Sequence, residues 1–267
     1  MGRGPWRVLE HVLMSLPSYL VAKLVAIKAA NMAEAPVYEI QGRQVKLPVE
    51  VRDASSGNAM YRVDAATAQA LLPGDAFKVV EPAPGLTQLL LGIIDYRDND
   101  LGDYNEAAII FFVHPKDGSP EDAGTFIYKL PVNQPFTCEA GCTIWGFPKT
   151  VDEIDYRYDD ETATCRLEMD GQHVFTLTLP RGRAQEGAAP AEDTAGPTYT
   201  YIGGVPHRTT FTTGGDTIVS PGDAGVELKL GPHPIADQLR ELGLPKPALI
   251  STWNDHMRGS FGVAEKL

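Results

Sequence analysis

The sequence predicts an α+β protein that is mainly antiparallel β-sheet, and three observations support this prediction. Short runs rich in β-branched and aromatic residues recur along the chain, and turn-forming Gly, Pro, Asn and Asp separate them. Only a few segments have helical periodicity. Ile109–Val113 is continuously apolar, which is typical of a strand covered on both sides. Together these features favour a closed or nearly closed antiparallel sheet.

The first 35 residues differ in texture from the rest. Val8–Ala30 is largely apolar but contains Glu10, His11, Pro17, Lys23 and Lys28. These interruptions argue against a membrane span and against a secretory signal peptide. We therefore expect an amphipathic helical extension over residues 1–35, ahead of a β-barrel domain over residues 36–267. Residues 6–30 would cap that domain, pack on a neighbouring subunit or make a weak contact with a membrane surface.

The barrel domain is predicted to begin with a β-hairpin. Val37–Gln41 and Gln44–Leu47 flank a glycine-containing turn. A helix is expected over Ala65–Leu72, because Asp64 is a good N-cap and a Pro-Gly pair follows the last helical residue. The other strands expected in this half are Ala59–Val63, Phe77–Val80, Gln88–Tyr96 and Ala107–His114.

The second half continues this pattern. An antiparallel meander is expected over Phe126–Leu130, Glu153–Tyr158, Thr164–Met169 and His173–Leu179, with a turn at Asp170-Gly171. Further strands are expected at Thr198–Ile202, Arg208–Thr213 and Val226–Leu230, and a short helix at Pro234–Leu242. Gly182–Gly196 is small, polar and rich in turn formers, so we interpret it as either a lid or a surface insertion.

Charge and cysteine content exclude several classes of protein. The formal net charge of −12 argues against a nucleic-acid partner, whose phosphates are neutralised by basic side chains. Three cysteines are too few for a disulfide-stapled fold, and no Cys/His spacing matches a metal site. Glycine-rich phosphate-binding loops and a serine nucleophile elbow are also missing from the sequence. We expect no cofactor, no metal and a reducing, cytoplasmic location.

The most informative segment surrounds Lys149. This lysine follows Trp145-Gly146-Phe147-Pro148, so aromatic and apolar side chains surround it in the sequence. Burial lowers the pKa of a lysine and makes its amine a nucleophile that can form a Schiff base with a ketone. Alternatively, Lys149 lies in a turn and reaches water past the tryptophan.

Two further charged residues are candidates for the same chemistry. Glu106 stands at the head of the apolar strand Ala107–Val113, where a carboxylate can shuttle protons. Arg52 has the guanidinium geometry that binds a carboxylate through two hydrogen bonds. A solvated strand end for Glu106 and a surface salt bridge with Glu50 or Asp53 for Arg52 are the simpler interpretations.

Taken in order, these segments resemble the acetoacetate decarboxylase superfamily. The resemblance lies in a Glu-bearing segment, Tyr104–Glu106, and an aromatic-Pro-Lys motif, Gly146–Lys149, about 40 residues later. Arg52, Pro197–Tyr199 and Pro234–Pro245 extend it over roughly residues 44–250. The resemblance implies a cone-like, closed, mainly antiparallel β-barrel in a homo-oligomer, without metal or organic cofactor.

The resemblance also implies roles for individual residues. Lys149 would be the Schiff-base lysine, Glu106 the catalytic carboxylate and Arg52 the partner of the substrate carboxylate. We further expect Tyr104, Trp145, Phe147 and Leu91 to contact the substrate. Two positions depart from the family pattern: Thr150 replaces a second lysine, and Leu89-Leu90-Leu91 replaces a segment that carries a pocket glutamate. The leucines predict a drier pocket and a larger or less polar substrate.

The function expected from these residues is lyase chemistry on a small-molecule keto acid. The amine of Lys149 would attack the keto carbon of a β-keto acid, and the iminium would accept the electrons released as carbon dioxide departs. The same iminium also serves aldolase-dehydratase, cyclase or hydratase reactions on a larger apolar substrate. A third alternative is a non-catalytic barrel that binds an apolar ligand.

Overall fold

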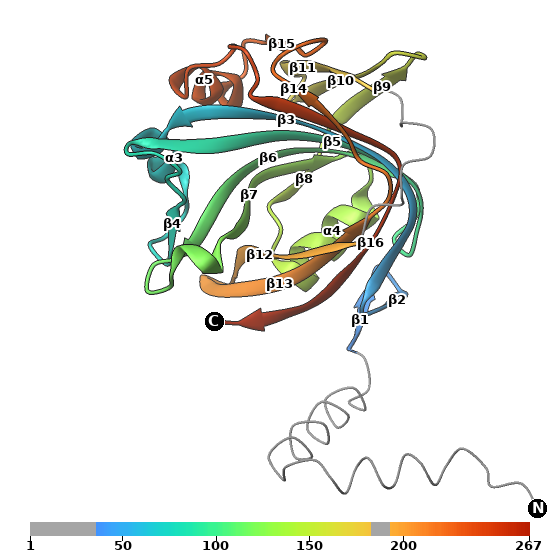
Figure 1. The fold of residues 1–267 in the computed structure, drawn as a ribbon. Coiled ribbons are helices and arrows are strands. Elements are labelled where there is room, and N and C mark those ends of the chain that lie inside the picture. The colour runs from blue at the N-terminus through green and yellow to red at the C-terminus, as the bar shows by residue number, and fades with distance from the viewer. Residues whose placement is uncertain (1–35, 183–192) are drawn as a thin grey trace, which may run out of the picture. The chain divides into compact units, whose positions relative to one another are not determined.

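A computed structural model describes residues 36–182 and 193–267, and its centre is a closed barrel of seven strands (Figure 1). Neighbouring strands of the barrel follow the order β6-β5-β3-β16-β13-β12-β7, and β7 pairs with β6 to close the ring. These pairs are antiparallel except for the short parallel contact between β7 and β12. The barrel strands are β3 (Val49–Asp64), β5 (Leu86–Asn99), β6 (Tyr104–Pro115), β7 (Gly124–Val132), β12 (Thr194–Ile202), β13 (Val205–Gly214) and β16 (Ile250–Lys266).

Shorter elements cover the barrel. A four-stranded antiparallel sheet with the order β15-β11-β10-β9 lies beside it, and a hairpin of β1 and β2 precedes β3. Three short strands, β4, β8 and β14, pair with the barrel strands β6, β7 and β16, respectively. The bounds are β1 (Val37–Ile40), β2 (Arg43–Lys46), β4 (Phe77–Val79), β8 (Lys149–Val151), β9 (Glu153–Tyr158), β10 (Thr162–Met169), β11 (Gln172–Pro180), β14 (Ile218–Pro221) and β15 (Glu227–Leu230). The helices are α3 (Ala65–Leu71), η1 (Pro120–Asp122), α4 (Pro135–Trp145) and α5 (Pro234–Glu241).

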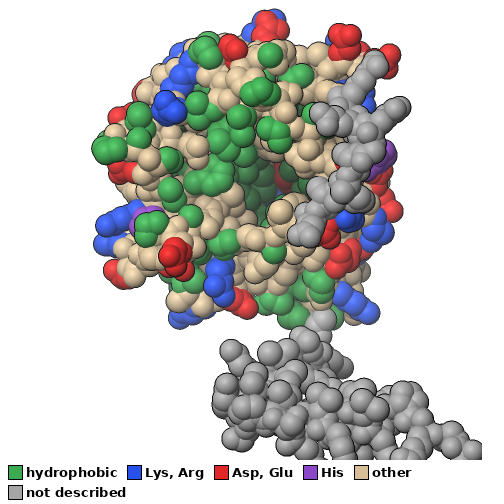
Figure 2. Space-filling model, viewed as in Figure 1, with side chains coloured by type: hydrophobic (Ala, Val, Ile, Leu, Met, Phe, Trp, Pro, Cys, Tyr) green, Lys and Arg blue, Asp and Glu red, His purple; other side chains and the backbone are tan. Residues whose placement is uncertain are grey.

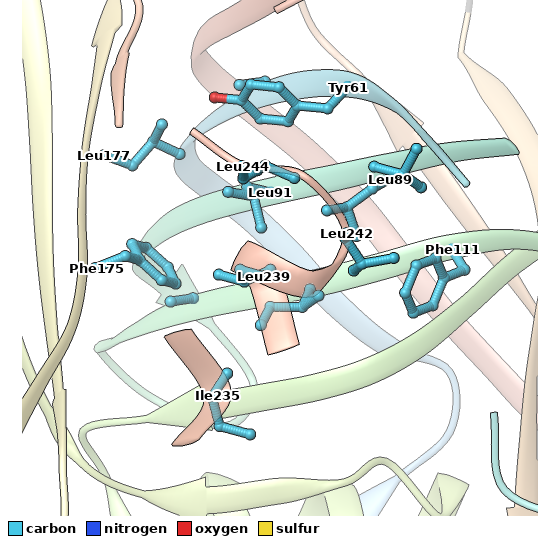
Figure 3. Close-up of a cluster of buried hydrophobic side chains, with 14 of the residues drawn as sticks. Tyr61, Leu89, Leu91, Phe111, Phe175, Leu177, Ile235, Leu239, Leu242 and Leu244 are labelled. Carbon is cyan, nitrogen blue, oxygen red and sulfur yellow. The ribbon is translucent and has the colours of Figure 1, made fainter. Parts of the chain in front are cut away.

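The main hydrophobic core lies outside the barrel, between its wall and the four-stranded sheet (Figure 3). Alternate residues of β5, namely Leu89, Leu91 and Ile93, face this core and are fully buried. Phe175 and Leu177 of β11 meet them from the covering sheet, and α5 adds further apolar side chains. Each buried leucine or phenylalanine contributes about 1.5–3 kcal/mol to folding, so this layer fixes the position of the wall behind the barrel interior.

A second core cluster lies at one end of the barrel. Helix α4 contributes Phe136, Ala140, Ile144 and Trp145 to it, and these pack with residues of β2, β3 and β7. The helix therefore closes this end of the barrel. The chain between α4 and β8 is consequently held against the barrel interior.

The predicted fold class and several predicted elements are confirmed. The hairpin β1–β2, helix α3 with its Asp64 cap and helix α5 all lie where expected. Three elements differ. Helix α4 was not expected, because Thr, Cys and Gly are weak helix formers and tertiary packing outweighs their propensity. Strand β3 is longer than expected, and β16 was not expected. Glycines and bulges interrupt the alternation of apolar and polar residues in both strands.

Two predicted segments lie wholly or mostly outside the described residues. These are the helical extension over residues 1–35 and most of the loop expected at Gly182–Gly196. The last three residues of that expected loop, Thr194–Gly196, instead begin strand β12 and pair with β13. Within residues 36–182 and 193–267, no helix is long and apolar enough to cross a membrane.

Candidate active site

The barrel interior contains a cavity of about 210 Å³. Figure 2 shows a hollow with largely hydrophobic walls on the viewed face, where the ribbon in Figure 1 shows the barrel interior. Most of its lining is apolar or aromatic and comes from all seven barrel strands and the α4–β8 connection. Lys149 and Glu106 are the only charged residues among the described residues that line it. The lining includes Leu90, Ile94, Tyr96, Tyr104, Ala108, Ile110, Ile127, Leu130, Trp145, Phe147, Phe211, Met257 and Phe261.

Lys149 enters this cavity because of how α4 ends. Gly146 adopts a left-handed conformation with φ of 68°, and its amide donates to carbonyl oxygens at the helix end. The amide of Phe147 donates to the carbonyl oxygen of Gly141, which completes a glycine-dependent helix stop. After Pro148, the chain continues as β8, with Lys149 beside Leu130 of β7. The turn thus delivers the lysine from the closed end of the barrel.

A glycine on α4 provides the space for the lysine side chain. A Cβ atom at Gly141 would lie 2.7 Å from both Cδ and Cε of Lys149. No side chain larger than hydrogen fits there while the lysine keeps its position. The alkyl part of Lys149 therefore runs along α4, and its amine reaches the cavity.

The amine of Lys149 contacts Glu106 directly. Lys149 Nζ lies 2.8 Å from Glu106 Oε2, and the two side chains are only 4% and 6% exposed. Nζ also donates to the hydroxyl of Thr137 at 3.4 Å and lies 4.9 Å from the ring centre of Tyr104. The lysine, the carboxylate and both neutral partners come from α4, β6 and β8, so three separate elements meet at one amine.

The charge of Glu106 controls the protonation of the lysine. Burial lowers the pKa of Lys149, but the Glu106 charge and the hydrogen bonds that the ammonium donates to Glu106 and Tyr104 raise it, and the net result is a pKa above the usual lysine value. This result differs from the sequence expectation that burial would yield a neutral amine. The raised pKa keeps the amine of Lys149 protonated, so Lys149 becomes nucleophilic only after its proton moves.

Two neighbours of this pair were not identified from the sequence. The hydroxyl of Tyr96 donates to Glu106 Oε1 at 3.4 Å, and its ring stacks on Tyr104 with centroids 4.4 Å apart. Burial and the Glu106 charge raise the pKa of Tyr96, so the phenol remains a donor. The apolar run of β5 carries no alternation in polarity that would have pointed to Tyr96. No sequence pattern pointed to Thr137, because α4 itself was not predicted.

The comparisons with known proteins agree with this architecture. The sequence model of the acetoacetate decarboxylase (ADC) family matches residues 35–257. The chain belongs to the acetoacetate decarboxylase family. A search of the curated proteins finds no significant match.

Solved structures of the acetoacetate decarboxylase type share the fold. The acetoacetate decarboxylase of Legionella pneumophila is 18% identical, covers 88% of this chain and 90% of its own, and has a TM-score of 0.57. An acetoacetate decarboxylase-like enzyme from Sphingomonas wittichii RW1 is 20% identical over 85% and 96% of the two chains, with a TM-score of 0.54. The enduracididine biosynthesis enzyme MppR, complexed with pyruvate, is 14% identical over 88% and 98%, with a TM-score of 0.59.

The structure brings five of the expected acetoacetate decarboxylase-like site residues together and leaves two elsewhere. Lys149, Glu106, Tyr104, Trp145 and Phe147 all line the cavity. Leu91 does not, because it points to the outer core, and its neighbour Leu90 faces the cavity instead. The apolar run on β5 has no alternation in polarity that would set which residues face inward.

Arg52 also lies away from the cavity. Its side chain is 49% exposed and binds Asp98 at 2.7 Å and Asp100 at 2.6 Å. Asp98 lies near the end of β5, which pairs with β3, and Asp100 directly follows that strand, so the two carboxylates bind the guanidinium at the surface. The surface salt bridge that the sequence also allowed is formed, although with partners across the sheet.

Thr150, which replaces a family lysine, also faces away from the cavity. Its side chain is exposed and donates to Asp152 at 2.6 Å. A residue at this position of β8 therefore does not contact Lys149 Nζ through the cavity. As for metals, no cluster of three or more His, Cys, Asp or Glu side chains occurs in the part of the chain that the structure describes.

Proposed function

We propose that this protein is a lyase in which Lys149 forms a Schiff base with the keto group of a keto acid, and that it decarboxylates a β-keto acid. The observation that carries this proposal is the 2.8 Å contact between Lys149 Nζ and Glu106 inside an apolar cavity. A buried lysine beside a proton acceptor is the arrangement that amine nucleophiles require. Glu106 is close enough for proton transfer without rearrangement.

The first chemical step uses the pair as a proton relay. Glu106 accepts a proton from the Lys149 ammonium, which leaves a neutral amine and a neutral carboxyl group. The amine attacks the keto carbon, and a proton of the attacking nitrogen passes to the former keto oxygen, which becomes a hydroxyl. Glu106 then returns its proton to this hydroxyl, which leaves as water. The product is an iminium, and Glu106 is again a carboxylate. Tyr96 stabilises that carboxylate through its hydrogen bond to Oε1.

The second step breaks the carbon–carbon bond. The electron pair of the bond to the carboxylate moves into the iminium, carbon dioxide leaves and a neutral enamine forms. The iminium and carboxylate charges disappear together in this step, and a low-dielectric cavity favours such a loss of charge. The enamine carbon then takes up a proton, and water hydrolyses the resulting iminium to release a ketone and the free lysine.

One observation favours a second candidate reaction. The described residues that line the cavity include no cation besides Lys149, and Arg52 lies on the surface. A substrate carboxylate would therefore have the iminium as its only positive neighbour. Carbon–carbon cleavage or condensation of a larger, neutral carbonyl compound through the same iminium needs no second cation, because such a substrate has no carboxylate. A barrel that binds an apolar ligand without an adduct is the remaining alternative.

The structural neighbours support keto-acid chemistry of this kind. Acetoacetate decarboxylases share the fold, and MppR has been crystallised with pyruvate and with the condensation product of pyruvate and imidazole 4-carboxaldehyde. We extend this chemistry to the present chain because its own lysine and carboxylate occupy the cavity. We also propose that it acts as a homo-oligomer in the cytoplasm, which light scattering and cell fractionation would test.

The decisive experiment is covalent trapping. Intact-mass spectrometry after incubation with acetoacetate or pyruvate and borohydride should show one reduced adduct on the wild type and none on Lys149→Ala. Lys78→Ala, which removes an exposed lysine, is the matched control and should be trapped like the wild type. An equal adduct on Lys149→Ala would refute the proposal. Carbon dioxide release from acetoacetate then separates decarboxylation from the second candidate.

A further inference from the structure

A second hollow adjoins the cavity of Lys149. It has a volume of about 280 Å³ and shares Ser56, Asn58, Thr213 and Met257 with the Lys149 cavity. Its other lining groups are hydroxyls, an amide and two glycines, and no charged residue lies among the described residues that line it. We call this hollow the polar pocket. Its polar side chains are Ser56, Asn58, Thr194, Thr213, Thr217, Thr252 and Asn254.

Asn58 holds a central position between the two hollows. Its side-chain amide donates to Thr252 Oγ1 at 3.2 Å, which anchors it on the wall formed by β3 and β16. Its Oδ1 lies over Gly92 of β5, where a Cβ atom would approach within 2.9 Å. Gly92 therefore provides the space for this oxygen, which explains a glycine inside the apolar strand β5.

The polar pocket lies within reach of a substrate attached to Lys149. Ser56 of β3 pairs with Ile94 of β5, and Ile94 pairs with Glu106 of β6. Ser56 and Glu106 are therefore separated by only two strand spacings. Asn58 lies one inward-facing position further along β3. The Cα atoms of Asn58 and Glu106 are thus roughly 12 Å apart by strand spacing and rise. A substrate with a chain of a few carbons would span this distance along the apolar wall of the Lys149 cavity.

We propose that the polar pocket is a subsite of the same active site and binds a neutral hydrogen-bonding group, a hydroxyl or an amide, at the far end of the substrate. This subsite, which rests on the proposed function, assigns the substrate class: a keto compound with an apolar middle and an uncharged polar end. A charged end is disfavoured, because none of the described residues that line the pocket carries an opposite charge to offset the desolvation of that end. The pocket's side chains already pair with one another, as Asn58 with Thr252 and Thr194 with Thr213, but each hydroxyl or amide can form a further hydrogen bond that an aliphatic end would not use.

Calorimetric binding of paired ketones tests this assignment without requiring an adduct. The probes are methyl ketones of about six to nine carbons that carry a terminal hydroxyl, each paired with the methyl-terminated ketone of equal heavy-atom count. At one chain length, we expect the hydroxyl ketone to bind about fivefold more tightly, the value of one net hydrogen bond. Equal affinity at every length would overturn the subsite and leave the polar pocket as a solvent entrance.

Variants locate the preference. Asn58→Leu and Thr213→Val should each abolish the hydroxyl preference while leaving binding of the methyl-terminated ketone within about twofold. Thr212→Val is the matched control, because Thr212 precedes Thr213 on β13 but does not line either hollow. If both pocket variants retain the preference, the subsite is refuted. Borohydride trapping of acetone, run in parallel, reports imine formation alone, so failure of the proposed function is distinguished from failure of the subsite.

Discussion

Leu90 and Leu91 are adjacent in the chain but lie on opposite faces of the barrel wall. Leu90 lines the cavity of Lys149, and Leu91 is fully buried in the core outside the barrel. Leu91→Ala should therefore lower the free energy of unfolding by about 2–5 kcal/mol and leave substrate preference unchanged. Leu90→Ala should cost less stability and improve trapping of longer ketones relative to acetoacetate. Urea denaturation and trapping measure the two effects, and similar profiles for both variants would contradict them.

Glu106→Gln should separate the two influences on Lys149. The charge that raises the lysine pKa is removed, and burial, which lowers it, remains. The lysine should lose its proton at a lower pH, so the pH dependence of borohydride trapping should shift toward acid. Because the proton relay is also lost, the rate at its optimum should fall by about 10²–10⁴-fold. An unshifted pH dependence would show that Glu106 does not control the amine.

The same substitution should change how stability depends on pH. In the wild type, the raised lysine pKa stabilises the fold below about pH 10.4, the ordinary lysine value, and this contribution is lost at higher pH. In Glu106→Gln, the protonated lysine is buried without its partner, at a cost of about 3–5 kcal/mol near neutral pH. Raising the pH toward 10 should narrow the gap to the wild type in urea denaturation. Glu153→Gln, at an exposed position, should show no such trend.

Gly141→Ala tests the space that α4 leaves for the lysine. The added methyl would lie 2.7 Å from two carbons of Lys149, while the helix itself tolerates alanine well. We expect the circular dichroism spectrum to be retained and the trapping rate to fall by at least about tenfold, because the amine is displaced from Glu106. Thr143→Ala, on the exposed side of the same helix, is the control. Normal trapping by Gly141→Ala would show that the lysine adjusts freely.

Arg52→Ala tests whether this surface arginine takes part in binding. Its guanidinium is held by Asp98 and Asp100 outside the cavity. We therefore expect unchanged KM and kcat for any accepted keto acid. A large rise in KM with constant kcat would show that Arg52 reaches the substrate carboxylate in a conformation other than this one.

The sequence was sufficient for the fold class, the family and the meeting of Glu106 with Lys149. Those predictions depended on the order of the motifs along the chain and on turn-forming residues, which determine the local backbone conformation. The position of Leu91 could not be fixed, because an all-leucine run carries no polarity alternation. The pairing of Arg52 with Asp98 and Asp100 could not be foreseen, because these carboxylates approach it only through the pairing of β3 with β5. The raised pKa of Lys149 likewise required the three-dimensional distance to Glu106, which no spacing provides.

The pairing of β3 with β16 has a consequence for how the protein is made. Asn58 and Thr252, which face each other on these strands, are 194 residues apart in the chain. The ring therefore cannot close on the ribosome until β16 has emerged, and such distant pairing is slow to form. Until then Lys149 has no Glu106 beside it to accept its proton, so its solvated amine stays protonated and unreactive at neutral pH. The nascent chain is thus protected from reacting with cellular ketones and aldehydes through this residue before folding is complete.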